Sequence, residues 1–349
     1  MSRKKRKKKR KVFFGFILIL LIAGGVLYYL WNNQPEVKEV IKKKVVKKLQ
    51  IVDENSKSRP IAVMINNNHQ AWPHAGLQDA YITYEIIAEG GITRMMAIFK
   101  DQDTSKIGSV RSARPYYLDY AMENDAIYVH FGYSDDAKRD IASLEIDNIN
   151  GLIDSSVFWR DTSLNKATEH TAFTSMEKIK GFAKEKGYDR DTNKDLLLNY
   201  SVDEISLEDH EGAMKADNIY IKYSYYTDTS YEYDSENKVY LRSMSSTAHT
   251  DAITGKQYTA KNIIITPIKN YSYDSYGRQK LENIGSGEGY FITDGYAAPI
   301  TWEKSSRSSQ TVYKFKDSGE EITVNDGNTF IQIQPMGETL TIEGNEPTE

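Results

Sequence analysis

The stretch from Glu89 to Pro115 decides the fold expected for this chain. It begins Glu89-Gly90-Gly91-Ile92-Thr93-Arg94, continues through an apolar run to Phe99 and a polar turn, and ends Ile107-Gly108-Ser109-Val110-Arg111-Ser112-Ala113-Arg114-Pro115. The apolar run predicts a strand, and a second strand is predicted around Val110, joined to the first by residues 100–106. Such a hairpin would carry three arginines toward one edge.

Strands and helices alternate on both sides of this stretch. Residues 61–65 are apolar and are followed by three asparagines, which indicates a buried strand that ends in a turn. Between 77 and 88 apolar residues recur at helical spacing, which predicts a helix that ends at Gly90. Further helices are predicted over 113–123, 135–144 and 175–186, and a further strand over 126–131. The alternation predicts an α/β domain from 59 to 200.

The second half of the chain has a different pattern. After residue 200, short runs rich in β-branched and aromatic residues alternate with turn sequences such as Asn325-Asp326-Gly327-Asn328. This pattern predicts a mostly β domain over 201–349, with mainly antiparallel strands.

Charge and composition restrict the function. The formal net charge is −4, but residues 3–11 contribute +9 and residues 36–48 contribute +4, so the chain from residue 51 onward carries about −17. An acidic body of this kind repels a phosphate backbone, so nucleic acid is not expected as its partner. The chain has no cysteine, which excludes disulfides, thiolate chemistry and attachment of a lipid to a cysteine.

The N-terminal region has the pattern of a membrane anchor. Residues 12–31 are apolar and uncharged over 20 positions, a length that suffices for a transmembrane helix. The basic tail 1–11 predicts a cytoplasmic N-terminus, with a Lys-rich stalk over 32–58 and an extracellular body in contact with membrane lipid. A cleaved signal peptide is the alternative interpretation.

The arginines of the opening stretch are the candidate binding residues. Planar guanidinium groups bind phosphate or carboxylate in a bidentate manner, so Arg94, Arg111 and Arg114 predict an anion site, to which the backbone N–H of Ser112 could contribute at a helix start. The alternative is that the arginines form internal ion pairs with acidic neighbours. These neighbours are Glu85, Glu89 and Asp119.

Candidate acid or base groups are less well defined. Asp119, His130 and His170 occur in or beside predicted loops and helices, and a Ser-His-Asp arrangement can be assembled from such residues in almost any secreted domain. No Gly-x-Ser-x-Gly sequence occurs in the first domain. No complete metal or cofactor signature is present, so neither is expected.

The sequence resembles the YerB-like family of Gram-positive envelope proteins. The resemblance rests on residues 59–67, 89–94 and 107–116 and on the later segment from Gly295 to Lys304, and it covers nearly everything from Arg59 to Pro335. It implies an N-terminal and a C-terminal domain of unknown function in a membrane-anchored protein. The family has no established catalytic residues, and the cysteine that anchors its lipoproteins is absent here.

A weaker similarity links the chain to the LytR-CpsA-Psr cell-wall ligases. It consists of one N-terminal span, an arginine that opens a strand, a polar turn and a strand that ends in paired arginines. Those enzymes bind polyprenyl-linked phosphate, but Met95-Met96 follow Arg94 where they have Asp-Thr. The difference removes an expected metal-binding carboxylate.

Two functions are therefore expected. The first is an extracellular cell-envelope protein, tethered to the membrane, that binds an anionic ligand such as a cell-wall polymer or polyprenyl phosphate through its arginines. The alternative is an envelope phosphotransferase or hydrolase that acts on polyprenyl-phosphate-linked polymers or peptidoglycan at the same place.

Overall fold

The computed structural model describes residues 20–29 and 47–345. The chain divides into two compact units, Met1–Lys47 and Lys48–Glu349. In the first unit, residues 20–29 are helical. Among the residues described, no helix is both long enough and apolar enough to cross a membrane. The predicted tail 1–11, half of the predicted span 12–31 and the first part of the predicted stalk, 32–46, lie outside the described residues.

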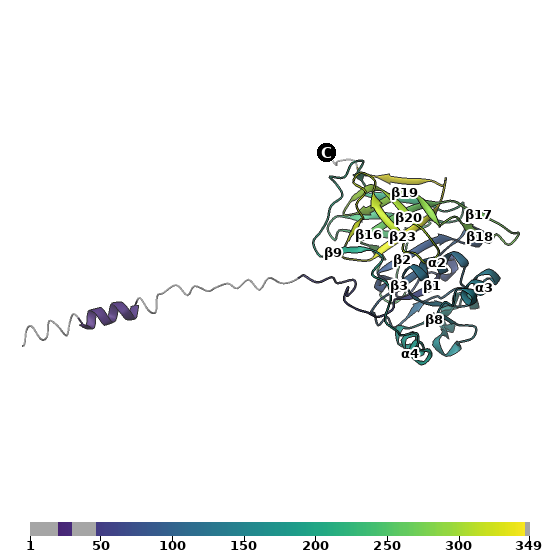
Figure 1. Ribbon diagram of the computed structural model, residues 1–349, viewed down its shortest axis with the longest axis horizontal. Helices are drawn as coiled ribbons and strands as arrows, with labels where there is room; N and C mark the ends of the chain where they lie inside the picture. The colour runs from purple at the N-terminus through teal and green to yellow at the C-terminus, as the bar shows by residue number, and fades with distance from the viewer. Residues whose placement is uncertain (1–19, 30–46, 346–349) are drawn as a thin grey trace, which may run out of the picture. The chain divides into compact units, whose positions relative to one another are not determined.

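Strands from both halves of the chain form one mixed sheet in the second unit (Figure 1). In spatial order its strands are β10 (Met214–Lys215), β20 (Tyr296–Lys304), β19 (Gly285–Thr293), β16 (Asn262–Ile268), β23 (Thr329–Pro335), β2 (Ile82–Ile87), β3 (Thr93–Phe99), β1 (Ile61–Asn66), β5 (Ile127–His130) and β6 (Asn148–Asn150), and β21 (Val312–Phe315) pairs with β20. The sheet is continuous where β2 of the first half pairs with β23 of the second.

Six of these strands point in one direction, and β20 shares it because β20 is antiparallel to β19, which is antiparallel to β16. β1 is parallel to β5, and β5 is parallel to β6. β3 is antiparallel to both β1 and β2, so β2 runs in the direction of β1. β2 is parallel to β23, which is parallel to β16. The carboxyl ends of all six strands therefore lie along the same edge of the sheet, called the carboxyl edge below.

Smaller sheets surround the central one. A second sheet has the order β14 (Thr247–Ala248), β13 (Val239–Met244), β12 (Asp228–Asp234), β11 (Asn218–Lys222) and β24 (Leu340–Glu343), with β15 (Thr259–Ala260) beside β13. The short sheets are β17 (Asn270–Ser272) with β18 (Gln279–Leu281), β22 (Thr323–Asn325) with β9 (Asn199–Ser201), and β4 (Ile107–Gly108), β8 (Ala172–Thr174) and β7 (Trp159–Arg160).

Helices cover both faces of the central sheet. Successive residues of β3 point to opposite faces, and Met96 belongs to one buried apolar cluster while Met95 belongs to the other. The first cluster includes the apolar faces of α2 (Pro115–Glu123) and α3 (Asp135–Ser143), and the second includes that of α4 (Met176–Lys186). Turns of 3-10 helix are η1 (His69–Ala71), η2 (Leu77–Asp79), η3 (Glu89–Gly91), η4 (Ser155–Val157), η5 (Thr162–Leu164) and η6 (Thr168–His170).

The helix predicted over 77–88 is wrong. The segment forms one 3-10 turn, η2, followed by strand β2, and all six residues of β2 are buried. A central strand that is covered on both faces loses the alternation of apolar and polar residues that identifies a half-exposed strand. Apolar side chains at helical spacing then reflect burial alone.

The predicted hairpin between residues 94–99 and the segment around Val110 is also wrong. The first strand exists as β3, but its partners are β1 and β2. β4 is only two residues long and pairs with β8. A long buried strand satisfies its backbone groups on both sides, and here neighbours remote in sequence supply those partners.

Other expected features agree with the structure more closely. The chain is built mainly from strands in mixed and antiparallel sheets, and the helices predicted over 113–123, 135–144 and 175–186 correspond to α2, α3 and α4. Residues at the end of the predicted stalk belong to the second unit, where Val52 is buried and Gln50 N donates to Asp326 Oδ2 at 2.8 Å. The division into domains at residue 200 stays a prediction.

Candidate anion-binding site at the carboxyl edge

The arginine-bearing segment lies at the carboxyl edge. The backbone N–H of Arg111 donates to Met64 O of β1, and Arg111 O accepts from Phe131 N just after β5, both at 2.9 Å. The next bond of this ladder joins Ala113 N to Gly132 O at 2.9 Å. Residues 110–113 therefore bridge the carboxyl ends of β1 and β5. Ligands of open α/β sheets bind at this kind of edge.

Glu89 holds two of the three arginines. It follows β2, and its carboxylate accepts from Arg94 Nη2 at 3.3 Å and from Arg114 Nη2 at 2.8 Å, with a further short contact from Arg114 Nε. Burial alone would raise the pKa of Glu89, but the hydrogen bond from Arg114 and the charge of Arg94 outweigh it and hold the pKa below its usual value. The sequence analysis gave internal ion pairs as the alternative to an anion site, and Glu89, one of the three acidic residues named there, forms them with Arg94 and Arg114.

Arg111 has a different environment. Its Nη1 donates to the backbone carbonyl of Glu169 at 3.2 Å, and within the described part of the chain no carboxylate lies within ion-pair distance of its guanidinium. Burial lowers the pKa of Arg111, and the charges of Arg114 and Arg160 lower it further against the opposing effect of Glu169. Its side chain is half-buried at the surface.

The cluster carries more positive than negative charge. Arg94 and Arg114 share the half-buried carboxylate of Glu89, and Arg111 adds a third positive charge nearby. Burial and then the charge of Arg114 lower the pKa of Arg94 to about 10, against the opposing charge of Glu89. Guanidinium groups remain protonated at neutral pH. Burial is the main cause of both lowered pKa values, and repulsion from Arg114 is a smaller one. An anion placed among them would relieve that repulsion.

Ser112 connects the cluster internally. Its carbonyl accepts from Arg94 Nη1 at 2.8 Å, and its hydroxyl donates to Phe131 O at 3.0 Å. Helix α2 begins beside it with Pro115 in the first turn and Arg114 at the N-cap, and no side chain caps the helix. The positive end of the α2 dipole therefore adds to the charge of the arginines.

Asp119 is used elsewhere. Its carboxylate accepts from Arg307 Nε at 2.6 Å and from Asn283 Nδ2 at 3.1 Å, and its side chain is almost fully buried. Burial raises the pKa of Asp119 despite the adjacent Arg307. The contacts join α2 to two segments of the second half of the chain, which is a structural ion pair.

The two candidate histidines differ in their surroundings. Both ring nitrogens of His130 are engaged, Nδ1 with Gly132 O at 2.7 Å and Nε2 with Asn148 Oδ1 at 3.1 Å. His170 directly follows Glu169, and its Nδ1 pairs with Asn66 Nδ2 at 2.8 Å. Burial, followed by the charge of Arg111, lowers the pKa of His170. Of the three acid or base candidates, His170 is thus the one whose titration is coupled to Arg111.

A buried polar network behind the site was not predicted from the sequence. Glu85 and Arg242 are fully buried and form an ion pair of 2.6 Å between β2 and β13. Arg242 also contacts His249 Nδ1, and His249 Nε2 lies 2.6 Å from His74 Nδ1. The partners are up to 175 positions apart, and only the polar run after residue 65 marks one end of the network.

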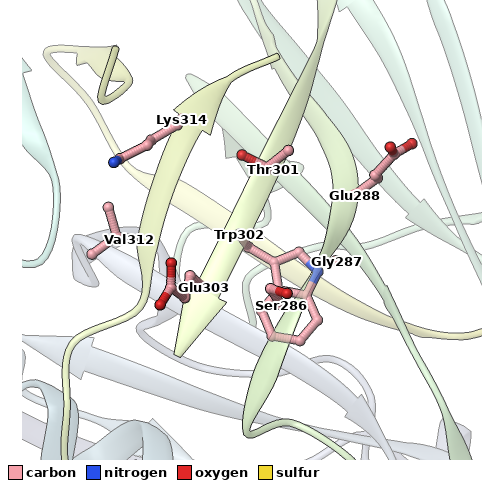
Figure 2. A pocket seen from close by; sticks show the side chains of 8 residues that line it. All are labelled: Ser286, Gly287, Glu288, Thr301, Trp302, Glu303, Val312 and Lys314. Carbon is pink, nitrogen blue, oxygen red and sulfur yellow. The ribbon is translucent and has the colours of Figure 1, made fainter. Parts of the chain in front are cut away.

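A groove of about 300 Å³ lies on another part of the molecule (Figure 2). It covers the outer face of β19, β20 and β21, and Figure 2 shows Glu288, Glu303 and Lys314 spread over this face without converging. The buried Nε1 of Trp302 has no hydrogen-bond partner and packs against Gly287. The groove contains none of the residues that the sequence predicted for a site.

Metal ligands are not gathered in the described part of the chain. Among residues 20–29 and 47–345, no three His, Asp or Glu side chains are arranged to hold a metal ion.

Comparisons with known proteins give a consistent identification. The chain matches the N-terminal domain of a protein of unknown function, DUF3048, over residues 48–189, and the C-terminal domain of the same family over residues 188–331. It is 33% identical over 292 residues to "Putative lipoprotein YerB" of Bacillus subtilis, covering 82% of this chain and 85% of that protein. The crystal structure of YerB from Bacillus subtilis superposes with a TM-score of 0.72 and 30% identity over 84% of this chain and 96% of that one.

Proposed function

The chain belongs to the DUF3048 family that includes YerB, and from this premise we propose that it is a membrane-tethered envelope protein that binds an anionic ligand at the carboxyl edge. The observation that carries the proposal is the cluster of three arginines at the carboxyl edge. Glu89 pairs with Arg94 and Arg114. Among the described residues, no carboxylate lies within ion-pair distance of Arg111. Arg111 supplies the guanidinium for the ligand, while Glu89 holds the other two in place.

The tether in this proposal is the apolar segment 12–31. The Bacillus subtilis relative carries the name "Putative lipoprotein YerB", which supports a membrane tether in this proposal. This chain has no cysteine to carry a lipid but has 20 consecutive uncharged, mainly apolar residues after a basic tail. The body is accordingly proposed to lie outside the cell, where the ligand is a cell-wall polymer or polyprenyl phosphate.

Binding of poly(glycerol phosphate) to the full-length protein in nanodiscs tests the anion site. Loss of one charge-assisted hydrogen bond is expected to weaken the affinity of Arg111→Ala by about tenfold or more. Lys180→Ala removes a cation from α4, where its Nζ pairs with Asp103 at 2.6 Å, and serves as the charge-matched control. Equal affinities of Arg111→Ala and wild type would rule out this site.

One observation favours the enzymatic alternative, a phosphotransferase or hydrolase. His170 is the acid or base candidate coupled to Arg111, and its lowered pKa keeps the imidazole neutral at physiological pH, as a general base requires. Hydrolysis or transfer of polyprenyl-linked phosphate by wild type, together with its loss in His170→Gln at unchanged anion affinity, would support this function. Activity that His170→Gln retains would contradict the role of this histidine.

A further inference from the structure

Two loops with exposed tyrosines flank the arginine cluster. One is the turn between β11 and β12, which carries Tyr225 and Tyr226, and the other is the hairpin β17–β18, which carries Tyr276 at its tip. Their exposed fractions are 89%, 71% and 77%, respectively. Eleven of the 25 tyrosines are buried, so three large rings left largely in solvent beside one turn suggest a binding surface. The three residues are called the aromatic strip below.

The first loop is attached directly to the cluster. Ser224 Oγ donates to Gly91 O at 2.5 Å, so the residue before Tyr225 is tied to the turn that carries Glu89. The fit is close, because a Cβ atom at Gly91 would lie 3.2 Å from Tyr226 Cδ2. The rings of Tyr225 and Tyr226 are 5.2 Å apart and nearly perpendicular, at 89°. They therefore present two flat faces at a right angle beside the arginines.

The second loop, the hairpin β17–β18, also approaches the turn Glu89–Gly91. A Cβ atom at Gly277 would lie 3.7 Å from Gly90 N. The hairpin is held by Tyr273, whose hydroxyl contacts Asp136 at the start of α3, and by Arg278, which pairs with Asp274 at 3.3 Å. The guanidinium of Arg278 lies 5.2 Å from the ring centroid of Tyr276 and adds a cation beside the strip.

The resulting surface is elongated. From β16, which leads into the hairpin, to β6 the sheet has six strand spacings, which amount to about 30 Å. Along this edge both tyrosine loops meet the turn Glu89–Gly91 that follows β2, and residues 110–113 lie farther along, at the carboxyl ends of β1 and β5. At the far end are Leu152 and Ile153, with exposed fractions of 63% and 72%. A single small anion would occupy only the middle of such a surface.

We propose that the ligand of this edge is an anionic glycan chain, with sugar rings stacked on the aromatic strip and its phosphate or carboxylate groups at Arg111. The inference rests on the proposed anion site and adds the class of ligand. A sugar offers an apolar C–H face together with hydroxyl groups, and an exposed tyrosine offers a ring face together with a hydroxyl, so the two match in polarity. Guanidinium groups match the charged substituents.

A lipid and a nucleic acid, the two other anionic ligands with apolar or flat groups, fit these observations less well than a glycan. A lipid tail needs a continuous apolar surface, whereas the exposed apolar side chains at this edge lie apart: Leu152 and Ile153 follow β6, Met336 follows β23 and Ile284 precedes β19. A nucleic acid would stack its bases on tyrosines equally well, but a body with a net charge of about −17 repels its backbone. Both remain outcomes of the test.

The test compares three polymers of matched length on the full-length protein in nanodiscs, with binding followed by interferometry. Dextran phosphate carries sugar and charge, poly(glycerol phosphate) carries the same number of phosphates without sugar, and dextran carries sugar alone. Wild type is expected to bind dextran phosphate about tenfold more tightly than poly(glycerol phosphate), because several rings stack at once. The double variant Tyr225→Ala, Tyr226→Ala is expected to lose this preference and to keep its affinity for poly(glycerol phosphate).

The controls separate the two proposals. The double variant Tyr225→Phe, Tyr226→Phe keeps the ring faces and is expected to retain the preference. Tyr220→Ala changes a tyrosine of β11 that lines a separate groove and is expected to behave as wild type. Arg111→Ala is expected to weaken both phosphate polymers alike. If Arg111→Ala weakens both but wild type shows no preference for the sugar polymer, the glycan inference is wrong and the anion site stands.

Three other results would also overturn the inference. The first is that Tyr225→Ala, Tyr226→Ala still prefers dextran phosphate to poly(glycerol phosphate). The second is that wild type binds vesicles that contain polyprenyl phosphate more tightly than dextran phosphate. The third is that wild type binds a thymidylate oligonucleotide more tightly than dextran phosphate. If Arg111→Ala leaves every affinity unchanged, the proposed function itself fails.

Discussion

Acid lability is the property that the buried network predicts most sharply. The guanidinium of Arg242 can only donate, so His249 Nδ1 accepts its hydrogen bond and the proton of His249 lies on Nε2. That proton is donated to His74 Nδ1 at 2.6 Å, and His74 Nε2 then donates to Asn66 O at 2.6 Å. Each of these hydrogen bonds needs a neutral imidazole. Protonation of either ring would place two donors face to face or a second cation beside Arg242.

The pKa values follow from this arrangement. Burial lowers the pKa of His74 from 6.5 to about 3, although the hydrogen bond to Asn66 opposes the shift. Burial and the charge of Arg242 hold the pKa of His249 well below its usual value. Asp251 raises the pKa of His74 and Lys166 lowers it, but neither reverses the effect of burial. Both rings are neutral in the folded protein throughout the physiological range.

The sign and size of the effect on stability can be worked out. A histidine with a depressed folded pKa stabilises the fold above its unfolded pKa, and this contribution is lost as the pH falls from about 6.5 toward the folded value, because only the unfolded chain takes up the proton. Between pH 7.5 and pH 5 the loss is about 2 kcal/mol for one such histidine and about 4 kcal/mol for His74 and His249 together. That is a large part of the roughly 5–15 kcal/mol that stabilises a typical domain.

Urea unfolding of the unit from Lys48 onward, measured between pH 7.5 and pH 5, tests the prediction. His130 and His170 also have lowered pKa values and add to the slope of wild type. The critical quantity is therefore the difference between wild type and His74→Gln, which is expected to lose about 2 kcal/mol less over this interval. His69→Gln removes an exposed histidine outside the buried pair and serves as the control variant. A slope in His74→Gln equal to that of wild type would refute the neutral pair.

Three further changes test the buried contacts by the same unfolding assay. Glu85→Gln leaves the charge of Arg242 without its carboxylate and is expected to lower the free energy of unfolding by about 3–5 kcal/mol. Glu85→Leu combined with Arg242→Met should recover much of that stability. A loss below about 1 kcal/mol in Glu85→Gln would contradict the pairing. Lys304→Met removes the ammonium group whose Nζ lies 2.7 Å from the carboxylate of the buried Glu123, and a similar loss of stability is expected. A much smaller loss would mean that water solvates this carboxylate. Gly91→Ala is expected to cost about 1–2 kcal/mol because φ there is +73°, and a neutral effect would mean that the turn can rearrange.

Local patterns predicted the elements whose burial is one-sided. The amphipathic helices α3 and α4 have the expected bounds because one face of each contacts solvent. β2 was missed because both of its faces are covered, and the partners of β3 were missed because the pairing of strands depends on remote segments. The same limit applies to the site. The ion pairs between Glu89 and its arginines span at most 25 positions, and the sequence analysis included them as an alternative to an anion site. The ion pair between Glu85 of β2 and Arg242 spans 157 positions and was not predicted.

The buried network gives the two halves of the chain a shared role in shaping the site. Arg242 belongs to the second half, and its hydrogen bonds run through His249 and His74 to the carbonyl of Asn66 at the end of β1. The side chain of Asn66 in turn meets His170, next to the carbonyl that holds Arg111. We therefore expect a change at Arg242 to be felt beside Arg111 through this series of contacts. The surroundings of Arg111 are thus connected through Asn66 to residues of the second half of the chain.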